Sequence, residues 1–262
     1  MKNDSEPDID RTHYDIVHNA RTLIGMDIFR QGRRNLGKEK MILYNGNSLN
    51  IGGATLVPKA AGLPDYTIRV RYTPGITPSS SRWDEVIPVD RENGIWDITI
   101  RNANWNYAFF VQHELLEILD ANIDNVTSMK YTFESCDNLT SVSLFNTANV
   151  TRMDYMFYGC RKLTTVPLFD TRNVTDMGSM FYGCINLTAV PLFNTSKVTY
   201  MSSMFHSCHN VQTGALALYQ QASTQATPPS SHTDTFYHCG YETTTGLAEL
   251  NQIPATWGGL LE

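Results

Sequence analysis

The sequence predicts an α/β solenoid with short parallel strands, and three observations carry the prediction. First, four copies of one pattern start 24 residues apart, at Asn125, Asn149, Asn173 and Lys197. Second, the apolar residues of each copy recur at fixed positions, so that a neighbouring copy could cover them. Third, the spacing falls within the range of about 20 to 50 residues that is typical of stacked repeats. Proteins built in this way usually act by presenting a surface.

Each copy divides into two halves. The second half, Leu163-x-x-Val166-x-Leu168, follows a leucine-rich pattern that predicts a short strand over Val166–Phe169, with Leu144, Leu168, Leu192 and Leu216 as one apolar column. Pro167 removes a ladder donor inside it, so this strand must be short or irregular. The first half, V-T-x-M-x-x-M-F-x-x-C, has apolar residues three or four apart. It predicts one or two helical or 3₁₀ turns, closed by Gly159 or Gly183.

The remaining chain predicts an N-terminal region over 1–110, made of a helix and a β-rich unit, and repeats with caps at both ends over 111–262. The expected elements are a helix over 13–34, a hairpin or two short strands within 41–57, strands over 66–72, 83–89 and 94–100, a helix or irregular first coil over 108–119, a short helix over 214–219, a restart of the repeat over 235–239 and a helix over 246–253. The apolar residues of 108–119 would cover the exposed end of the first repeat.

Composition and charge exclude several classes of protein. The chain has 262 residues, is 42% hydrophobic and carries a net charge of −6, which disfavours bulk nucleic-acid binding. One basic stretch is predicted to be a solvated face, with a partner contact as the alternative; it contains Arg30, Arg33, Arg34, Lys38 and Lys40. The printed N-terminus has no apolar stretch typical of an export signal, and no run of 18 apolar residues is present. We therefore expect a protein made in the cytoplasm without a membrane span.

Motifs for catalysis are missing from the sequence. It contains no phosphate-binding loop, dinucleotide fingerprint, zinc-protease helix or nucleophile elbow, so we predict no catalytic residue, no cofactor and no metal ligand. A zinc site is the minority alternative for one cluster, which holds His206, Cys208, His209, His232, His238 and Cys239. Cys136, Cys160, Cys184 and Cys208 share one repeat position, which predicts buried free thiols. Asp170 and Asp176 could act as glycosidase carboxylates only by coincidence of spacing.

Two sets of residues are candidates for a binding surface. Phe145, Phe169 and Phe193 follow the predicted strand: if they point outward they form an aromatic strip for a protein or glycan, and if they point inward they belong to the core. The second set consists of columns that vary from copy to copy. The variable columns are Ser128, Arg152, Asp176 and Tyr200; Glu134, Tyr158, Tyr182 and His206; and Asp137, Arg161, Ile185 and His209. Residues in such columns either determine which partner is bound, or vary without functional consequence because they are exposed.

The repeats resemble a known family. The runs N-V-T-x-M-x-x-M-F-x-x-C-x-x-L-T-x-V-P-L-F-[DN]-T cover roughly 125–220, with an echo at 235–239, and resemble the BspA-like leucine-rich repeats of Bacteroidetes surface proteins. Similar repeats occur in adhesins and in proteins of Bacteroidales phages and prophages. The whole layout, with I-W-D-I before the repeats and G-A-L-A-L-Y-Q-Q-A-S-T-Q after them, is similar to the phage group.

The resemblance and the missing export signal together lead to a functional expectation. We expect a non-enzymatic structural protein of a Bacteroidales phage virion. Its region 1–110 would contact other virion proteins, with a homo-oligomer as one arrangement, and its solenoid would contact a host protein or glycan. The alternative is a bacterial cell-surface adhesin of the BspA-like type. A polysaccharide-active enzyme is the third alternative.

Overall fold

The computed structural model describes residues 42–44, 48–51, 54–56 and 66–262, and contacts divide the chain between Gly62 and Leu63. In the first unit, β1 (Ile42–Tyr44), β2 (Ser48–Ile51) and β3 (Ala54–Leu56) form an antiparallel sheet in that order. The hairpin predicted within 41–57 is confirmed, with a third strand added. The helix predicted over 13–34 and the basic stretch from Arg30 to Lys40 lie outside the described residues.

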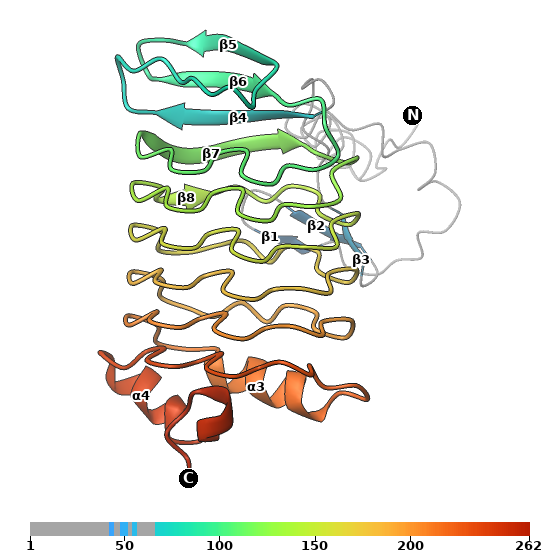
Figure 1. Cartoon of the computed structure of the whole chain (residues 1–262), viewed down its shortest axis with the longest axis vertical. Helices are drawn as coiled ribbons and strands as arrows, with labels where there is room; N and C mark the ends of the chain where they lie inside the picture. The colour runs from blue at the N-terminus through green and yellow to red at the C-terminus, as the bar shows by residue number, and fades with distance from the viewer. Residues whose placement is uncertain (1–41, 45–47, 52–53, 57–65) are drawn as a thin grey trace, which may run out of the picture. The chain divides into compact units, whose positions relative to one another are not determined.

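The second unit starts with a five-stranded mixed sheet in the order β5-β6-β4-β7-β8 (Figure 1). Its strands are β4 (Thr67–Tyr72), β5 (Glu85–Asp90), β6 (Ile95–Thr99), β7 (Leu115–Asn122) and β8 (Ser141–Val142). The three strands predicted between residues 66 and 100 are confirmed. β4 pairs antiparallel with β6 and β7, whereas β7 and β8 pair in parallel. Because β4 pairs with β7, residues 66–110 share one unit with the repeats, and the contact boundary falls earlier than the expected boundary at 110.

The predicted helix over 108–119 is wrong, and the alternative of an irregular first coil describes the segment. Residues 108–114 form turns, and the chain then enters β7, in which Leu115 and Ile118 are buried. Pairing of β7 with β4 fixes this segment as a strand, because the ladder to β4 satisfies its backbone groups.

The four sequence copies form stacked coils, visible as parallel loops in Figure 1. Backbone groups join equivalent positions of neighbouring coils: Met129 N donates to Arg152 O at 3.0 Å, and Met177 N donates to Tyr200 O at 2.8 Å. A continuous column of parallel bridges runs through Asn104, Ser128, Arg152, Asp176, Tyr200 and Ser231. The predicted restart of the repeat is confirmed, because Phe205 N donates to Thr235 O at 2.8 Å across the inserted segment.

The first half of each coil is a chain of single turns, and neither an α-helix nor a 3₁₀-helix forms in these described residues, so the prediction of helical or 3₁₀ turns is wrong. Met156 N donates back to Met153 O at 3.1 Å, but Phe157 N donates to Met180 O of the next coil at 2.9 Å. Because alternate amides point to the neighbouring coil, they cannot make the internal bonds that a helix needs. Gly159 and Gly183 end these turns as predicted, with φ of 72° and 70° in the left-handed region that favours glycine.

The interior holds nearly all of the predicted apolar columns. The valine, methionine, phenylalanine and cysteine columns of the four copies are buried, from Val126, Met129, Phe133 and Cys136 in the first to Val198, Met201, Phe205 and Cys208 in the last. The leucine column is the exception, since Leu168 is 60% exposed and Leu192 is 51% exposed. The core of each coil is therefore filled mainly by aromatic and sulfur-containing side chains, which stack on their equivalents.

Phe145, Phe169 and Phe193 do not form an exposed aromatic strip, so these predicted binding residues are wrong and the core alternative is confirmed, because all three side chains are buried at 2% exposure or less. No strand covers 166–169. Instead, Phe169 N donates to Pro167 O at 3.0 Å, and Phe193 N donates to Pro191 O at 2.9 Å. This three-residue turn breaks the alternation of a strand and rotates the phenylalanine inward while the preceding leucine turns outward.

The C-terminal end of the stack is covered by α3 (Ala215–Thr224), α4 (Thr244–Leu250) and the 3₁₀ turn η1 (Ala255–Trp257). Both short helices predicted in this region are confirmed, with shifted ends. The carboxylate of Glu249 in α4 accepts from the backbone N of Gly214 at 3.2 Å and of Leu216 at 3.1 Å, which satisfies amides at the start of α3. Within the described residues, α3 and α4 are the α-helices, so the stack itself is a mixed sheet and turns.

Candidate binding surface

Two columns of half-exposed aromatic rings follow the coils. Tyr107, Tyr131 and Tyr155 stack with ring centroids 4.5 and 4.6 Å apart. The second column is Tyr158, Tyr182, His206 and Tyr237, with successive centroids 4.8, 4.4 and 4.8 Å apart. Tyr155 and Tyr158 join the two columns at 5.8 Å. We call these seven rings the aromatic ladder.

The backbone turns explain why the first column of the ladder reaches the surface. Tyr107, Tyr131 and Tyr155 have φ of 60°, 56° and 59°, so each sits in the left-handed region. This conformation costs a non-glycine residue about 1–2 kcal/mol. Stacking of each ring on its neighbour contributes about 0.5–1.5 kcal/mol and offsets much of that cost. The ladder is therefore held by contacts between coils and cannot form in a single copy.

The stacked rings present their edges to solvent, because their faces lie against one another. Their interplanar angles are 12° for Tyr107 and Tyr131 and 10° for Tyr158 and Tyr182. Partial burial raises the pKa of Tyr158 and lowers the pKa of His206, so near pH 7 both are held in their neutral forms. The ladder thus offers a flat rim of neutral phenol and imidazole edges. Rims of this kind are suited to contacts that combine apolar area with hydrogen bonds.

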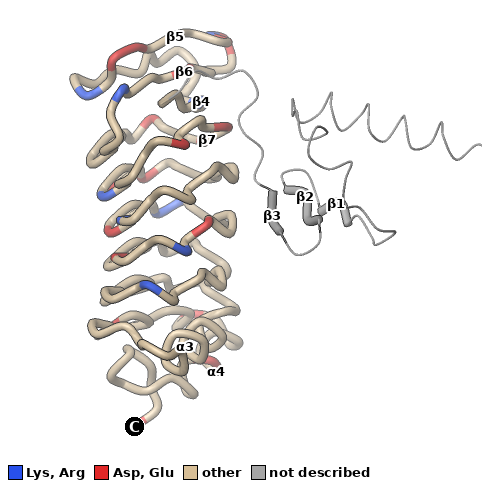
Figure 2. Tube along the Cα trace, turned by 90° about the vertical axis from the view of Figure 1, so that its right-hand side faces the viewer, with Lys and Arg blue, Asp and Glu red and all other residues tan. Residues whose placement is uncertain are grey.

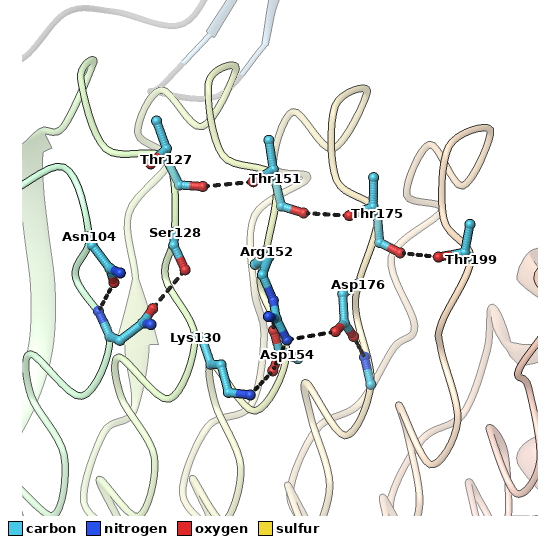
Figure 3. Close-up of polar contacts among 12 residues, drawn as sticks. Asn104, Thr127, Ser128, Lys130, Thr151, Arg152, Asp154, Thr175, Asp176 and Thr199 are labelled. Carbon is cyan, nitrogen blue, oxygen red and sulfur yellow. Dashed lines mark hydrogen bonds and ion pairs between the residues drawn. The ribbon is translucent and has the colours of Figure 1, made fainter.

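Arg152 and Asp176 belong to a polar column that follows the bridges between neighbouring coils, and Figure 3 shows its contacts. Arg152 donates to both oxygens of Asp154, at 3.0 and 3.1 Å, and its Nη2 donates to Asp176 at 2.9 Å. Lys130 Nζ lies 3.0 Å from Asp154, whose side chain is 3% exposed. The hydrogen bond to Asp154 raises the pKa of Arg152, and burial raises the pKa of Asp176. These charges largely pair with one another, so the main role of the polar column is to hold neighbouring coils together, and little of its charge is available to a partner.

Tyr200 continues the polar column and stands apart from the ladder. It is 47% exposed, and its ring covers Gly178, where a Cβ atom would come within 2.5 Å of the ring. The structure therefore separates the predicted site residues into groups. Tyr158, Tyr182 and His206 meet in the ladder, whereas Arg152, Asp176 and Tyr200 belong to the polar column.

The asparagines and threonines of the repeated Asn-x-Thr sequences bind neighbouring coils. Asn149 Nδ2 donates to Asp124 O at 2.6 Å, and Asn173 Nδ2 donates to Ala148 O at 2.9 Å. The hydroxyls of Thr151 and Thr175 donate hydrogen bonds to the backbone carbonyl oxygens of Thr127 and Thr151, each in the preceding coil, as Figure 3 shows. These hydrogen bonds between coils are a structural reason for the recurrence of the motif, and no role in ligand binding is needed to explain it.

Sequence reasoning missed the first three rings of the ladder and the buried Asp154. A signal for Tyr107, Tyr131 and Tyr155 was present, since they are 24 residues apart. For Tyr107 the signal was hidden because its coil lacks the V-T pattern: Asn102 stands where Val126 stands one copy later. Burial of Asp154 had no signal, because its two cations become neighbours only through the stack.

A polar pocket lies next to the first ring of the ladder. Its volume is about 340 Å³, and its lining includes Arg82, Asp84, Arg101 and three asparagines, Asn102, Asn104 and Asn106. The Arg82 guanidinium also lies 5.6 Å from the ring centre of Tyr107, so the pocket and the ladder share an edge. None of these pocket residues belonged to the predicted site.

The alternative of a zinc site is not supported by the arrangement of side chains in the described residues. No group of three or more His, Cys, Asp and Glu side chains in that part of the chain could hold a metal ion. Cys208 and Cys239 are fully buried as free thiols, and burial raises the pKa of both. A raised pKa opposes the thiolate form that a metal requires.

No helix in the described residues is long and apolar enough to cross a membrane.

Comparisons with known proteins find one family model and two solved structures that are similar to parts of this chain. Residues 103–217 match a family model described as a Mycoplasma protein of unknown function, DUF285. Among solved structures, the chain is similar to a leucine-rich repeat protein from Eubacterium ventriosum ATCC 27560, with 24% identity over 41% of this chain and a TM-score of 0.33. It is also similar to a leucine-rich repeat protein of T. pallidum, with 12% identity over 68% of this chain and 96% of that one and a TM-score of 0.38.

The family match over residues 103–217 overlaps the region in which the repeat resemblance was predicted, and both similar structures are bacterial leucine-rich repeat proteins. The chain spans 28% of the length of the E. ventriosum protein. No curated protein matches the sequence.

Proposed function

We propose that this chain is a non-enzymatic binding protein, in which a BspA-like leucine-rich repeat solenoid presents the aromatic ladder to a protein or glycan at a bacterial surface. The observation that carries the proposal is the ladder itself. Its seven rings are held in register by the coils, with stacking distances between 4.4 and 4.8 Å within each column. A rigid aromatic surface binds at low entropic cost, because its side chains are ordered before the partner arrives.

Other observations support a role in binding. The interior is filled by stacked apolar side chains and the charges of the polar column pair with one another, whereas the ladder and the adjoining pocket reach solvent. Tyrosine is enriched where proteins meet partners, since its ring gives apolar area and its hydroxyl gives a hydrogen bond. No catalytic motif was found in the sequence, and the described residues contain no candidate metal site.

The location of the protein is a further part of the proposal. A bacterial cell surface is the location suggested by the resemblance of the repeats to those of BspA-like surface proteins. The virion role expected from sequence has no support in these comparisons and becomes an outcome of the test. In either location the N-terminal part of the chain would supply the anchor, and the coils would supply the contact surface.

The test combines a ladder variant with a matched control. Tyr158→Ser together with Tyr182→Ser removes two stacked rings, and Tyr200→Ser removes one exposed ring from the polar column. The full chain and both variants are incubated with surface fractions of the producing bacterium and of neighbouring species, and retained protein is quantified. Thermal unfolding of each variant confirms that it is folded. We expect the ladder variant to lose most of its retention and the Tyr200 variant to keep it.

Two results decide the matter. Equal retention of a folded ladder variant and the unaltered chain would contradict binding through the ladder. An antibody against the chain, applied to separated cell-envelope and phage-particle fractions, addresses location. Signal in the envelope fraction supports the surface role, and signal confined to purified particles would replace it with the virion role.

A further inference from the structure

We infer that the pocket next to Tyr107 binds an acidic sugar residue, with Arg82 taking the carboxylate and the amides of Asn102, Asn104 and Asn106 taking ring oxygens and hydroxyls. This inference rests on the proposed binding function and names a ligand class for one end of the same surface. It starts from the hydrogen-bonding groups that line the pocket, which are predominantly donors.

The three asparagines have their carbonyl oxygens fixed by the fold. Asn102 Oδ1 accepts from Asn104 N at 2.9 Å, and Asn104 Oδ1 accepts from Asn106 N at 3.1 Å. Asn106 Oδ1 accepts from Ser128 Oγ at 2.6 Å. With each oxygen engaged, the amide nitrogens have one defined orientation. These three Nδ2 groups make no hydrogen bond to another described residue, so each can donate to a ligand.

The two guanidinium groups differ in how they are engaged. Arg101 Nη2 lies 3.2 Å from Glu85, and the Arg101 backbone N donates to Asp84 Oδ2 at 2.5 Å. Arg82 forms no ion pair with any other residue that the structure describes, and its contact is the Tyr107 ring. Arg82 is therefore the cation available to a carboxylate, and its planar fork suits bidentate contact. Asp84 adds one acceptor, which a sugar hydroxyl can donate to.

The balance of donors favours a sugar acid over an acidic peptide. A peptide carboxylate would also satisfy Arg82, but the backbone groups of a peptide are spread along its chain, whereas one sugar ring brings several acceptors and donors together for the three amides and Asp84. A uronic-acid residue carries a carboxylate, a ring oxygen and several hydroxyls, which can both accept from amides and donate to Asp84. The pocket volume of about 340 Å³ lies at the lower end of ligand pockets, as a single sugar residue requires.

The experiment titrates the full chain with four probes, monitored by calorimetry at low salt. The probes are trigalacturonic acid, its methyl ester, the neutral sugar maltotriose and the capped peptide acetyl-Glu-Glu-Glu-amide. The variants are Arg82→Gln, Asn104→Asp and the control Arg161→Gln. Asn104→Asp is almost isosteric: it keeps the oxygen that holds Asn106 N and replaces the amide donor with a negative charge. Arg161 is exposed and lies in another column of the coils.

We expect trigalacturonic acid to bind the unaltered chain and Arg161→Gln with the same affinity. Arg82→Gln, Asn104→Asp and esterification of the ligand should each weaken binding by roughly tenfold or more, because each removes or opposes a charge-assisted hydrogen bond. Circular dichroism spectra that match the unaltered chain would show that the variants are folded.

Several outcomes would overturn the inference. These are no saturable binding of the sugar acid, equal binding of the ester, or binding that survives both pocket variants. Peptide binding that depends on Arg82, without sugar binding, would assign the pocket to a protein partner instead. Each of these failures leaves the Tyr158 and Tyr182 retention test unaffected, so the pocket and the ladder can fail separately.

Discussion

At the scale of single residues, the cysteine column shows how one side chain ties two coils together. Cys160 Sγ donates to Phe133 O at 3.1 Å, and Cys184 and Cys208 make the same bond to the phenylalanine carbonyl 27 residues earlier. Each thiol is fully buried and its pKa is raised by burial, to about 12 for Cys136. The neutral thiol is therefore part of the folded core, and its ionisation opposes folding.

The thiols predict a loss of stability at alkaline pH. A cysteine in the unfolded chain ionises near 9.0, whereas Cys136 in the fold ionises near 12. Because the folded pKa is the higher one, stability is complete below about pH 9 and falls as pH rises toward 12. The slope is about 1.4 kcal/mol per pH unit for each thiol. Urea unfolding at several pH values measures it.

Cys160→Ala provides the control for that prediction. The variant should be less stable near pH 7 because it leaves a small cavity, but its stability should fall less steeply above pH 9. Tyrosine ionisation affects both proteins, so the difference between the slopes isolates the thiol. Identical slopes would show that burial of Cys160 does not control alkaline unfolding.

Leu168 and Phe169 are neighbouring residues with opposite roles. Phe169 is 2% exposed and stacks on Phe157 at 6.2 Å, whereas Leu168 is 60% exposed. We expect Phe169→Ala to lower the free energy of unfolding by about 3–5 kcal/mol and Leu168→Ala to change it by less than about 0.5 kcal/mol. Chemical denaturation of the two variants checks this directly. A larger loss of unfolding free energy for Leu168→Ala than for Phe169→Ala would contradict this and would place the leucine in the core.

This pair also marks a limit of prediction from sequence. The spacing of 24 residues predicts the columns, and most columns are buried as expected. Spacing alone cannot decide which of two adjacent apolar residues points inward. That choice follows from the turn between Pro167 and Phe169, a local geometry that the leucine-rich pattern does not encode.

At the scale of the structural element, one coil is joined to the next by both backbone and charge. Lys130, Arg152 and Asp154 come from neighbouring coils, and the Asp154 side chain is 3% exposed between the two cations. A buried carboxylate with two cations is tolerated, but the same carboxylate without them is strongly destabilising. The ion pairs therefore enforce the register of the coils more than they raise net stability.

The charge cluster predicts a pattern over three variants. Lys130→Met alone leaves Arg152 to neutralise Asp154, so we expect a loss of about 1 kcal/mol. Lys130→Met with Arg152→Met leaves the carboxylate unpaired and should cost about 3 kcal/mol, the lower end of the usual range because Arg152 is partly exposed. Adding Asp154→Asn should recover most of that loss. Urea unfolding decides, and a triple variant no better than the double would contradict the account.

Prediction at this scale was also uneven. The strands β4, β5 and β6 could be predicted because alternating apolar residues are bounded by Pro, Gly and Asn turns. The turns of each repeat could not, because residues three or four apart also satisfy a helical pattern. What distinguishes them is donation of alternate amides to the next coil, a long-range property of the stack.

At the scale of the whole molecule, function is proposed for surfaces that exist only after the coils stack. No single repeat holds more than two rings of the ladder, and the rings meet through contacts between residues 24 apart. The two ends of the stack also differ in positive charge. The first coil borders the pocket that contains Arg82 and Arg101. No Lys or Arg follows Lys197, and the C-terminal cap in Figure 2 is correspondingly free of blue.

The existence of a presenting surface could thus be predicted from the period, but its composition could not. Tyr158, Tyr182 and His206 were recognised as one variable column, while Tyr107 and Tyr237, at the two ends of the ladder, lie in coils whose sequences depart from the repeat. The pocket escaped prediction altogether, because it joins residues before β5 to the turn after β6.

The most direct test of the ladder as the contact surface is tyrosine footprinting by mass spectrometry. The full chain is oxidised briefly, free and bound to the surface fraction that retains it, and modification is quantified at each tyrosine. We predict that Tyr158, Tyr182 and Tyr237 lose reactivity on binding, whereas Tyr200, which is 47% exposed in the polar column, keeps it. Protection of Tyr200 with unchanged ladder tyrosines would contradict the account and move the contact to the polar column.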